Sequence, residues 1–353
     1  MRTSFLIPVY NTDLAVLRLC INSTLKAAGS EHEVVVVDDA SDRAETREFL
    51  SRCKSAGLEN LKLLCNSENS GVSYSLNKAA KNATGALYAP VDHDDMVVTS
   101  GFRQMIRYQT YYGLSWSYSD EYQINNKGSV ISRMYKPSYC PQLLRSLMYI
   151  NHLQLIPRDL FELAGGYRES FDGSQDHDLA LRLSEITDPI HTDTVAYLWR
   201  RGDFSYSIEH GRIGKSSIDA SKRALEEHFQ RLGMNATVIA HELSPSHELS
   251  PQPTGTFISR IQPTSVPKLS IIIPCKLGTT LIVGEQTINV LEHCLQSIKR
   301  SIPLSATPTI ESPDVEIILI LNDGDEIQKA DEVIQGFGFQ GMSICDEPGF
   351  NFA

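Results

Sequence analysis

Residues 33–39 read EVVVVDD, a short β-branched run that ends in two carboxylates. Buried strands of parallel sheets have this composition, because helices cover both of their faces. The run TSFLIPV at residues 3–9 has the same character. An amphipathic helix is predicted between the two runs, over Leu14–Ala28, with Gly29 as its stop. The order strand, helix, strand is the start of an α/β domain.

The alternation of strands and helices continues as far as residue 92. NLKLLCN at 60–66 is a third predicted strand, Ser73–Asn82 a helix, and ALYAPVD at 86–92 a fourth strand. We therefore predict a doubly wound, mostly parallel α/β sheet. Ligands of such sheets bind at the carboxyl ends of the strands.

Several carboxylates fall at these predicted strand ends. They are Asp38, Asp39, Asp92, Asp94 and Asp95. The three in VDHDD repel one another unless a cation or hydrogen-bond donors offset their charge. Carboxylate oxygens suit Mg²⁺ or Mn²⁺, ions that keep part of their coordination shell for phosphate oxygens, so a nucleoside diphosphate is the natural ligand. The first pair, followed by Ser41, could instead cap the next helix.

The chain contains an internal repeat. SFLIPVYN and EVVVVDDAS near the start correspond to LSIIIPCK and VEIILILNDGD near the end. The matched residues are Pro8 with Pro274, Cys20 with Cys294, and Asp39 with Asp323. We expect a first α/β domain at 1–241, a Ser/Pro-rich linker with a connecting strand at 242–266, and the opening of a second, similar domain at 267–353.

Composition excludes some classes of protein. A net charge of −11 over 353 residues argues against a surface for nucleic acid. The seven cysteines are scattered without metal-ligand spacing, which favours a reduced, cytoplasmic chain. Pro8 interrupts the N-terminal apolar run, so we predict no signal peptide, and no run approaches the roughly 20 apolar residues of a membrane span. We expect at most peripheral association with the inner face of the membrane.

The motifs together resemble the family 2 glycosyltransferases of GT-A fold. IPVYN, VVVDDAS, NSGVSYSLNKA, VDHDD and GSQDHDLALRL stand in the order and spacing of that family. The segment YSDEYQINNKGSVISRMYKPSYCPQLL, followed by GGY, is similar to bacterial enzymes of rhamnan and other surface-polysaccharide (O-antigen type) synthesis, which often carry tandem transferase domains. The resemblance covers nearly all of 1–241, and from about Pro267 it covers a first fragment of a second transferase domain.

The resemblance implies a nucleotide-sugar site. Pro8 and Tyr10 would line the base, and Asp39 would accept from the imide of uracil or thymine. Asp92 would reach the ribose, and Asp94 would hold Mn²⁺ or Mg²⁺ on the diphosphate. The implied substrates are a UDP- or dTDP-sugar donor and a glycan or lipid-linked saccharide acceptor.

Asp176, in SQDHD, would be the catalytic base of an inverting transfer. Without the resemblance, Asp176 would be interpreted as a carboxylate that stabilises the N-terminal end of the helix predicted from LALRL. Asp95 would be a helper or a cap. Gly165 and Gly166 would let the backbone approach the sugars, or they are a helix stop after DLFELA.

One motif departs from the family pattern. Relatives place histidines where Leu198 and Gly202 stand here, and the later one can complete the metal site. Asp203 or water would then take the open position. His191 and His210 lie nearby in the sequence, but a lone histidine is more often structural.

Three other classes of protein share some of these features. A sugar-1-phosphate nucleotidylyltransferase needs a glycine-rich N-terminal loop, and FLIPVYNT contains no glycine. A haloacid-dehalogenase-type phosphatase needs Thr or Val where Met96 stands. A non-catalytic module that binds nucleotide sugars or glycans in a polysaccharide assembly complex remains an alternative, as does a further C-terminal transferase domain or partner.

Overall fold

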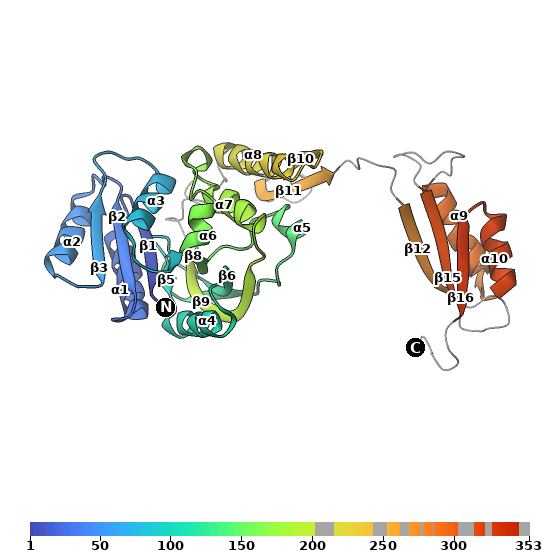
Figure 1. Cartoon of the computed structure of the whole chain (residues 1–353), viewed down its shortest axis with the longest axis horizontal. Coiled ribbons are helices and arrows are strands. Elements are labelled where there is room, and N and C mark those ends of the chain that lie inside the picture. The colour runs from blue at the N-terminus through green and yellow to red at the C-terminus, as the bar shows by residue number, and fades with distance from the viewer. Residues whose placement is uncertain are drawn as a thin grey trace. The chain divides into compact units, whose positions relative to one another are not determined.

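A computed structural model describes residues 1–201, 215–242, 253–261, 268–275, 278–284, 286–302, 314–321 and 327–345. The chain divides into two compact units, Met1–Ile261 and Gln262–Ala353 (Figure 1). Each unit has its own hydrophobic core.

The first part of unit 1 alternates strands and helices as predicted. Its elements are β1 (Thr3–Val9), α1 (Leu14–Ala28), β2 (Glu33–Asp38), α2 (Ala44–Ser55), β3 (Leu61–Cys65), α3 (Val72–Asn82) and β4 (Leu87–Pro90). Strands β3, β2, β1 and β4 lie side by side in that order, and all of them are parallel. The doubly wound, mostly parallel sheet is therefore confirmed for this part of the chain.

The second part of unit 1 extends the same sheet with mixed strand directions. Its elements are β5 (Met96–Val97), α4 (Thr99–Tyr112), β6 (Ser117–Ile124), β7 (Val130–Met134), α5 (Pro141–Leu144), β8 (Gln154–Pro157), α6 (Arg158–Leu163), the 3₁₀ turn η1 (Glu169–Phe171), α7 (Gln175–Ser184), β9 (Ile190–Arg200), α8 (Lys215–Arg231), β10 (Ala236–Glu242) and β11 (Pro253–Ile261). The strand order continues β4-β8-β6-β9-β5, and β8 is antiparallel to both β4 and β6.

Helices cover both faces of the parallel strands. Leu6, Val35 and Val37 pack in one core with Leu76 of α3, whereas the alternate residues of β1 and β2 pack in a second core with α1. Because successive side chains of a strand point to opposite faces, two covered faces require a continuous apolar run. This accounts for the EVVVV sequence of β2.

Strand β11 belongs to unit 1, although it follows the Ser/Pro-rich stretch. It pairs antiparallel with β10, and Phe257 is buried in the core that α3 helps to form. The backbone N–H of Phe257 donates to the carbonyl of Ser146 at 2.7 Å. Unit 1 therefore extends to Ile261, and most of the linker motif, residues 243–252, lies outside the described residues.

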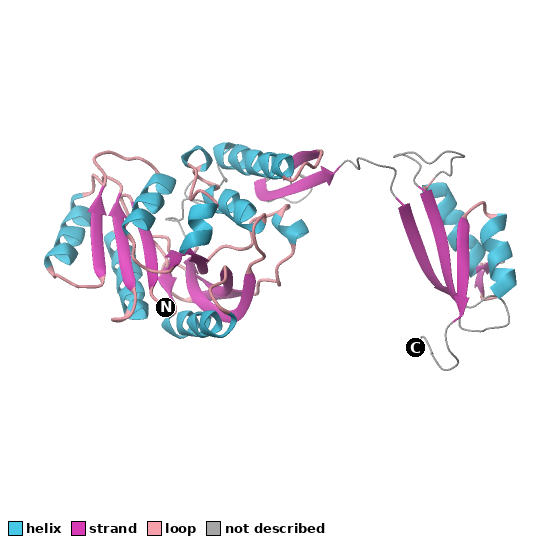
Figure 2. Ribbon diagram, viewed as in Figure 1, coloured by secondary structure: helices cyan, strands magenta, loops and turns pink. Residues whose placement is uncertain are grey.

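Unit 2 repeats the opening of unit 1. Its elements are β12 (Lys268–Cys275), β13 (Thr280–Val283), β14 (Gln286–Asn289), α9 (Val290–Ser301), β15 (Asp314–Leu321), α10 (Ile327–Gly336) and β16 (Gln340–Cys345). Strands β12, β15 and β16 form a parallel sheet in that order, and α9 and α10 share one core with it (Figure 2). Apart from the added β13–β14 hairpin, this is the order of β1 to β3, so the repeat read from the sequence is confirmed in the fold. Asp323 lies outside the described residues.

None of the helices in the described ranges combines the length and apolar character of a bilayer span.

Candidate active site

The carboxyl ends of β1, β2 and β4 meet at one edge of the sheet, and most of the predicted site residues follow these strands. Pro8 is buried within β1 opposite Val37, and Tyr10, just past the strand, is 42% exposed. The backbone N–H of Asp39 donates to the carbonyl of Val9 at 2.8 Å, which fixes the end of β2 beside the end of β1. Of the two residues assigned to the base, only Tyr10 presents its side chain to solvent.

Asp39 holds the loop that leads into α3. Its Oδ1 accepts from the amide of Asn66 at 2.6 Å and from the backbone N–H of Ser70 at 2.8 Å, and its Oδ2 accepts from the N–H of Gly71 at 2.9 Å. A carboxylate has about four acceptor sites, so one remains for a donor such as a base imide. Asp39 therefore has a structural role whether or not it also contacts a base.

The helix-cap interpretation of the Asp38–Asp39 pair does not match the structure. Helix α2 has Arg43 at its N-cap and no side-chain capping bond. Asp38 instead accepts from the backbone N–H of Ser41 at 3.1 Å, within the turn that follows β2.

The turn after β4 brings three potential metal ligands together. Asp92, Asp95 and His152 each offer an atom, and these atoms lie within 4.8 Å of one another. Asp92 Oδ2 is 3.0 Å from His152 Nε2. Asp94, the residue expected to hold the metal, is not one of the three; its Oδ1 lies 3.9 Å from His93 Nδ1.

The acidic residues of this turn differ in their electrostatics. Burial, and then the charge of Asp94, raise the pKa of Asp95 well above its usual range. Burial acts to raise the pKa of Asp92 as well, but the charge and hydrogen bond of His152 outweigh it and lower that pKa. Burial likewise acts to lower the pKa of His152, yet the adjacent Asp92 and Glu121 raise it well above normal.

These residues fit a divalent cation. Asp95 is 1% exposed, and its Oδ1 accepts from the backbone N–H of Arg200 at 2.6 Å. Its Oδ2 has no hydrogen-bond partner in the part of the chain that the structure describes. Leaving a buried carboxylate oxygen unpaired is costly, and a cation removes that cost.

Sequence reasoning did not identify His152. It precedes β8, and because β8 is antiparallel to β4, the start of β8 lies beside the end of β4, where Asp92 follows. A polar residue directly before the apolar run LQLIP was the available signal, but only the strand pairing gives it a partner.

Asp176 lies in the first turn of α7, and its Oδ1 accepts from the backbone N–H of His177 at 2.8 Å. Burial raises the pKa of the Tyr167 hydroxyl, and the charges of Asp176 and then Asp92 raise it further. Asp176 and Asp92 thus both act on the pKa of Tyr167.

Two neighbouring carboxylates are held in structural contacts. Asp178 is fully buried between Arg168 and Arg182, with Arg182 Nη2 at 2.7 Å. Asp172 Oδ1 accepts from the backbone N–H of Ser73 at the start of α3. Asp176 is thus better suited than either to meet a substrate.

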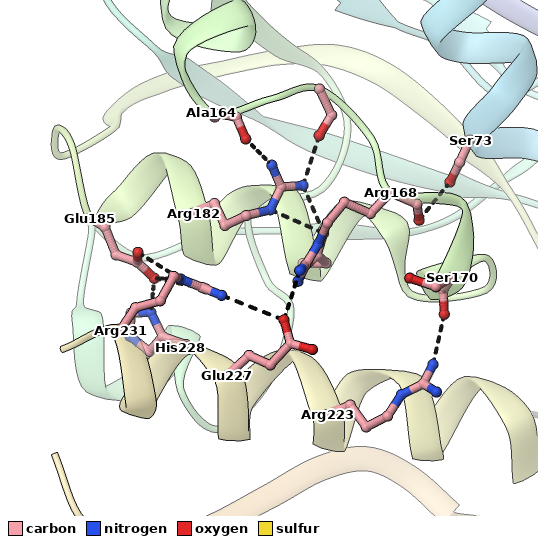
Figure 3. A network of polar contacts seen from close by, with 12 residues as sticks. Ser73, Ala164, Arg168, Ser170, Arg182, Glu185, Arg223, Glu227, His228 and Arg231 are labelled. Carbon is pink, nitrogen blue, oxygen red and sulfur yellow. Dashed lines mark hydrogen bonds and ion pairs between the residues drawn. The ribbon is translucent and has the colours of Figure 1, made fainter. Parts of the chain in front are cut away.

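A network of polar contacts fixes the segment before α7 (Figure 3). Arg168 pairs with Glu227 of α8 at 2.7 Å, and its carbonyl accepts from the hydroxyl of Ser73 at 3.4 Å. Arg182 donates to the carbonyls of Ala164 and Gly166. The network joins α3 and α8 to α7, the helix whose first turn carries Asp176.

Gly165 and Gly166 end helix α6. Both have positive φ, and their backbone N–H groups donate to the carbonyls of Glu162 and Phe161. This is the geometry of a helix stop. It favours the helix-stop interpretation over close approach to a sugar.

The structure describes only some of the residues at which the sequence departs from the family pattern. Leu198 pairs with Met96 between β9 and β5, and His191 Nε2 lies 2.9 Å from Asp120 Oδ1. His191 therefore has a structural partner away from the cluster of Asp92, Asp95 and His152. Gly202, Asp203 and His210 lie outside the described residues.

Residues 4–164 match the family described as Glycosyl transferase family 2. The chain is 30% identical over 278 residues to the O-antigen biosynthesis protein RfbC of Myxococcus xanthus, covering 77% of this chain and 20% of that protein. It is 26% identical over 196 residues to chondroitin synthase of Escherichia coli, and the match covers 55% of this chain and 28% of that protein. The chain thus spans less than a third of the length of either relative.

The fold is similar to that of a solved glycosyltransferase structure. S. aureus TarS 1–349 in complex with UDP-GlcNAc has a TM-score of 0.52 and 17% identity, covering 65% of this chain and 66% of that one. The mixed, largely parallel sheet flanked by helices is accordingly a GT-A fold. The match over residues 4–164, together with this fold, identifies this part of the chain as a family 2 glycosyltransferase domain.

Proposed function

We propose that unit 1 is an inverting glycosyltransferase, which moves a sugar from a nucleoside-diphosphate donor to a hydroxyl of a glycan acceptor in bacterial surface-polysaccharide synthesis. The observation that carries this proposal is the cluster of Asp92, Asp95 and His152 at the sheet edge. Asp176 and Asp92 also both raise the pKa of Tyr167. Such an edge is where α/β sheets bind nucleotides.

Specific residues would bind the donor. Tyr10 and Pro8 would line the base, and the remaining acceptor capacity of Asp39 would meet its imide. Asp92 would reach the ribose, and Asp94 would hold the Mn²⁺ or Mg²⁺. The cation, when bound, offsets the negative charge that the departing nucleoside diphosphate gains.

Asp176 would act on the acceptor. Its carboxylate would take the hydroxyl proton as the acceptor oxygen attacks C1 of the donor sugar, and the bond from C1 to the diphosphate oxygen would break. Attack on the face opposite the leaving group inverts the anomeric centre. The Arg168–Asp178–Arg182 contacts would keep the start of α7, and so Asp176, in place.

The relatives narrow the choice of donor and setting. TarS was solved with UDP-GlcNAc, which favours a UDP-sugar over a dTDP-sugar here, and RfbC and chondroitin synthase are named for polysaccharide products. We place the reaction in the cytoplasm, because the six cysteines whose side chains are described are all free thiols. A glycan or lipid-linked saccharide would then be met at the inner membrane face.

Substitution of Asp176 by Asn tests the proposed base. Asp176→Asn keeps the shape of the side chain, so we expect donor affinity to persist while transfer falls by about 10²-fold or more. Transfer is measured with a panel of UDP-, dTDP- and GDP-sugars, and donor binding by thermal shift. Asp188→Asn, an exposed position after the other end of α7, is the matched control and should transfer normally.

Two results would contradict the proposal. If Asp176→Asn transferred sugar at the wild-type rate, a residue other than Asp176 would be the base. Donor binding without transfer or donor hydrolysis in the wild type, with and without Mn²⁺, would favour a non-catalytic binding module. A further check is Asp94→Ala, which should weaken Mn²⁺-dependent affinity for the diphosphate.

A further inference from the structure

The potential metal ligands lie next to two adjacent strands. Asp92 and Asp95 lie in the turn after β4, whereas His152 lies two residues before β8, which pairs with β4. Asp92 Oδ2 and His152 Nε2 are 3.0 Å apart. Neighbouring ligands about 2.1 Å from an octahedral ion are themselves separated by about 3.0 Å. The spacing of these two atoms therefore matches two ligands of one ion.

The carboxylate of Asp95 supports the same conclusion independently. It is 1% exposed, and although Oδ1 is hydrogen-bonded to Arg200, Oδ2 is unpaired among the described residues. An ion pair between Asp92 and His152 alone would account for their contact but would leave this oxygen unsatisfied. A cation within reach of all three residues accounts for both observations.

The surroundings fix the orientation of His152. Its ring stacks on that of Tyr197, with centroids 4.6 Å apart and planes 15° from parallel. Glu121 Oε2 lies 3.7 Å from His152 Nδ1, and Lys136 Nζ holds Glu121 at 3.0 Å. Metal-binding histidines commonly have a carboxylate on the side of the nitrogen that does not bind the metal. Glu121 lies on that side at ion-pair distance, and Nδ1 has no hydrogen-bond partner among the described residues. His152 Nε2 is thus directed at the carboxylates of Asp92 and Asp95.

We infer that His152 binds the divalent cation of unit 1 through Nε2, together with Asp92 and Asp95 and in addition to the Asp94 of the proposed function. Asp92 then binds the cation rather than the ribose. The inference rests on the proposed function only in that the cation is the one expected on the donor diphosphate. It supplies a histidine ligand from the segment before β8, which is separate from the segment around Gly202 where the family resemblance places one. The carboxylates of the site suit Mn²⁺.

The test uses the full chain with Mn²⁺ alone, without donor or acceptor. Electron paramagnetic resonance of free Mn²⁺ gives the affinity, and pulsed measurements detect the nitrogen of a coordinated imidazole. We expect nitrogen coupling in the wild type. His152→Gln should lose the coupling and bind Mn²⁺ at least about tenfold more weakly. His191→Gln, which removes a histidine hydrogen-bonded to Asp120 elsewhere in the sheet, should keep both.

A second measurement needs no variant. In wild-type protein labelled with ¹⁵N-histidine, the nitrogen coupling should change to the ¹⁵N pattern. This result does not depend on whether His152→Gln folds. Wild-type protein that binds no Mn²⁺, Mn²⁺ bound without nitrogen coupling, or coupling that survives in folded His152→Gln would each overturn the inference.

The outcome is separable from that of the proposed function. Sugar transfer by a protein whose Mn²⁺ shows no nitrogen coupling would overturn the histidine ligand and leave the function standing. Nitrogen coupling in a protein that neither binds nor transfers a nucleotide sugar would support the ligand and contradict the function.

Discussion

The two units begin with the same strands in the same register but differ in what covers them. Ser4 lies opposite Glu33 in unit 1, and Ser270 lies opposite Glu316 in unit 2. Two residues further along, Leu6 is 1% exposed and Ile272 is 59% exposed. A shared strand pattern therefore does not produce a shared environment.

Helix α3 explains this difference. In unit 1, α1 packs on one face of β1 and β2, and α3 packs on the other. In unit 2, α9 and α10 pack together on the face of β15 that includes Val315 and Ile317, and no described helix packs on Ile272. The later elements of the first unit, rather than its opening strands, complete the core.

The paired Ser–Glu contact shows the same contrast. Glu33 Oε1 accepts from the hydroxyl of Ser4 at 2.6 Å and also from Thr84, and Oε2 lies 3.0 Å from Lys62 Nζ. Glu33 thus joins β1, β2, β3 and the approach to β4. Glu316 accepts from the hydroxyl of Ser270 but is exposed.

The largest expected difference concerns the matched core positions. Leu6→Ala should destabilise unit 1 by about 3 kcal/mol, because the cavity lies between β1 and α3. Ile272→Ala should cost less than about 1 kcal/mol. Both tryptophans, Trp116 and Trp199, lie in unit 1, so urea unfolding followed by their fluorescence reports on that unit alone. Hydrogen exchange in β12 and β15 reports on unit 2. Equal losses of stability in Leu6→Ala and Ile272→Ala would contradict the difference between the two units.

A smaller difference is expected for the matched glutamates. Glu33→Gln loses the ion pair with Lys62 and disturbs buried hydrogen bonds, so unit 1 should lose about 2 kcal/mol. Glu316→Gln should change the stability of unit 2 by less than about 0.5 kcal/mol, since that side chain is exposed. The same two measurements apply, and a large loss in Glu316→Gln would show that its contact with Ser270 matters more than its exposure suggests.

The effect of Glu33 should depend on pH. Burial acts to raise its pKa, but hydrogen bonds from Ser4 and Thr84, and then the contact with Lys62, lower the pKa from 4.5 to about 2. The ionised form therefore stabilises unit 1 fully above about pH 4.5, and this contribution declines as the pH falls towards 2. Urea midpoints of wild type and Glu33→Gln should converge over that interval; a constant difference would mean that the charge of Glu33 is not the cause.

The opening of the fold could be predicted well, because local patterns determine it. β1 and α1 have the predicted bounds, and β2 and α3 differ from them by one residue. The strand predicted to reach Asp92 ends at Pro90, so Asp92 lies in the turn that places it near His152.

The mixed half of the sheet could not be predicted, because its stability depends on distant partners. Strand β6 reads SYSDEYQI and buries Asp120 and Glu121, which local patterns assign to the surface. Their charges are offset by Arg133, Lys136 and His191, residues 13 to 71 positions away. For the same reason Asp92 and Asp95 could be predicted from local patterns, whereas His152 could not.

We propose that unit 1 alone carries out transfer. The carboxylates after β4, His152 and Asp176 all come from elements that have no counterpart among the described residues of unit 2. A cut near Gly255 would remove Phe257 from the core of unit 1, so the division after Ile261 is the informative one.

The most direct measurement compares sugar transfer by residues 1–261, by residues 262–353 and by the full chain, with the same donor and acceptor and with folding verified by circular dichroism. We predict that 1–261 transfers at the rate of the full chain to within about twofold and that 262–353 does not transfer. A folded 1–261 without transfer activity, or transfer by 262–353 alone, would contradict the account.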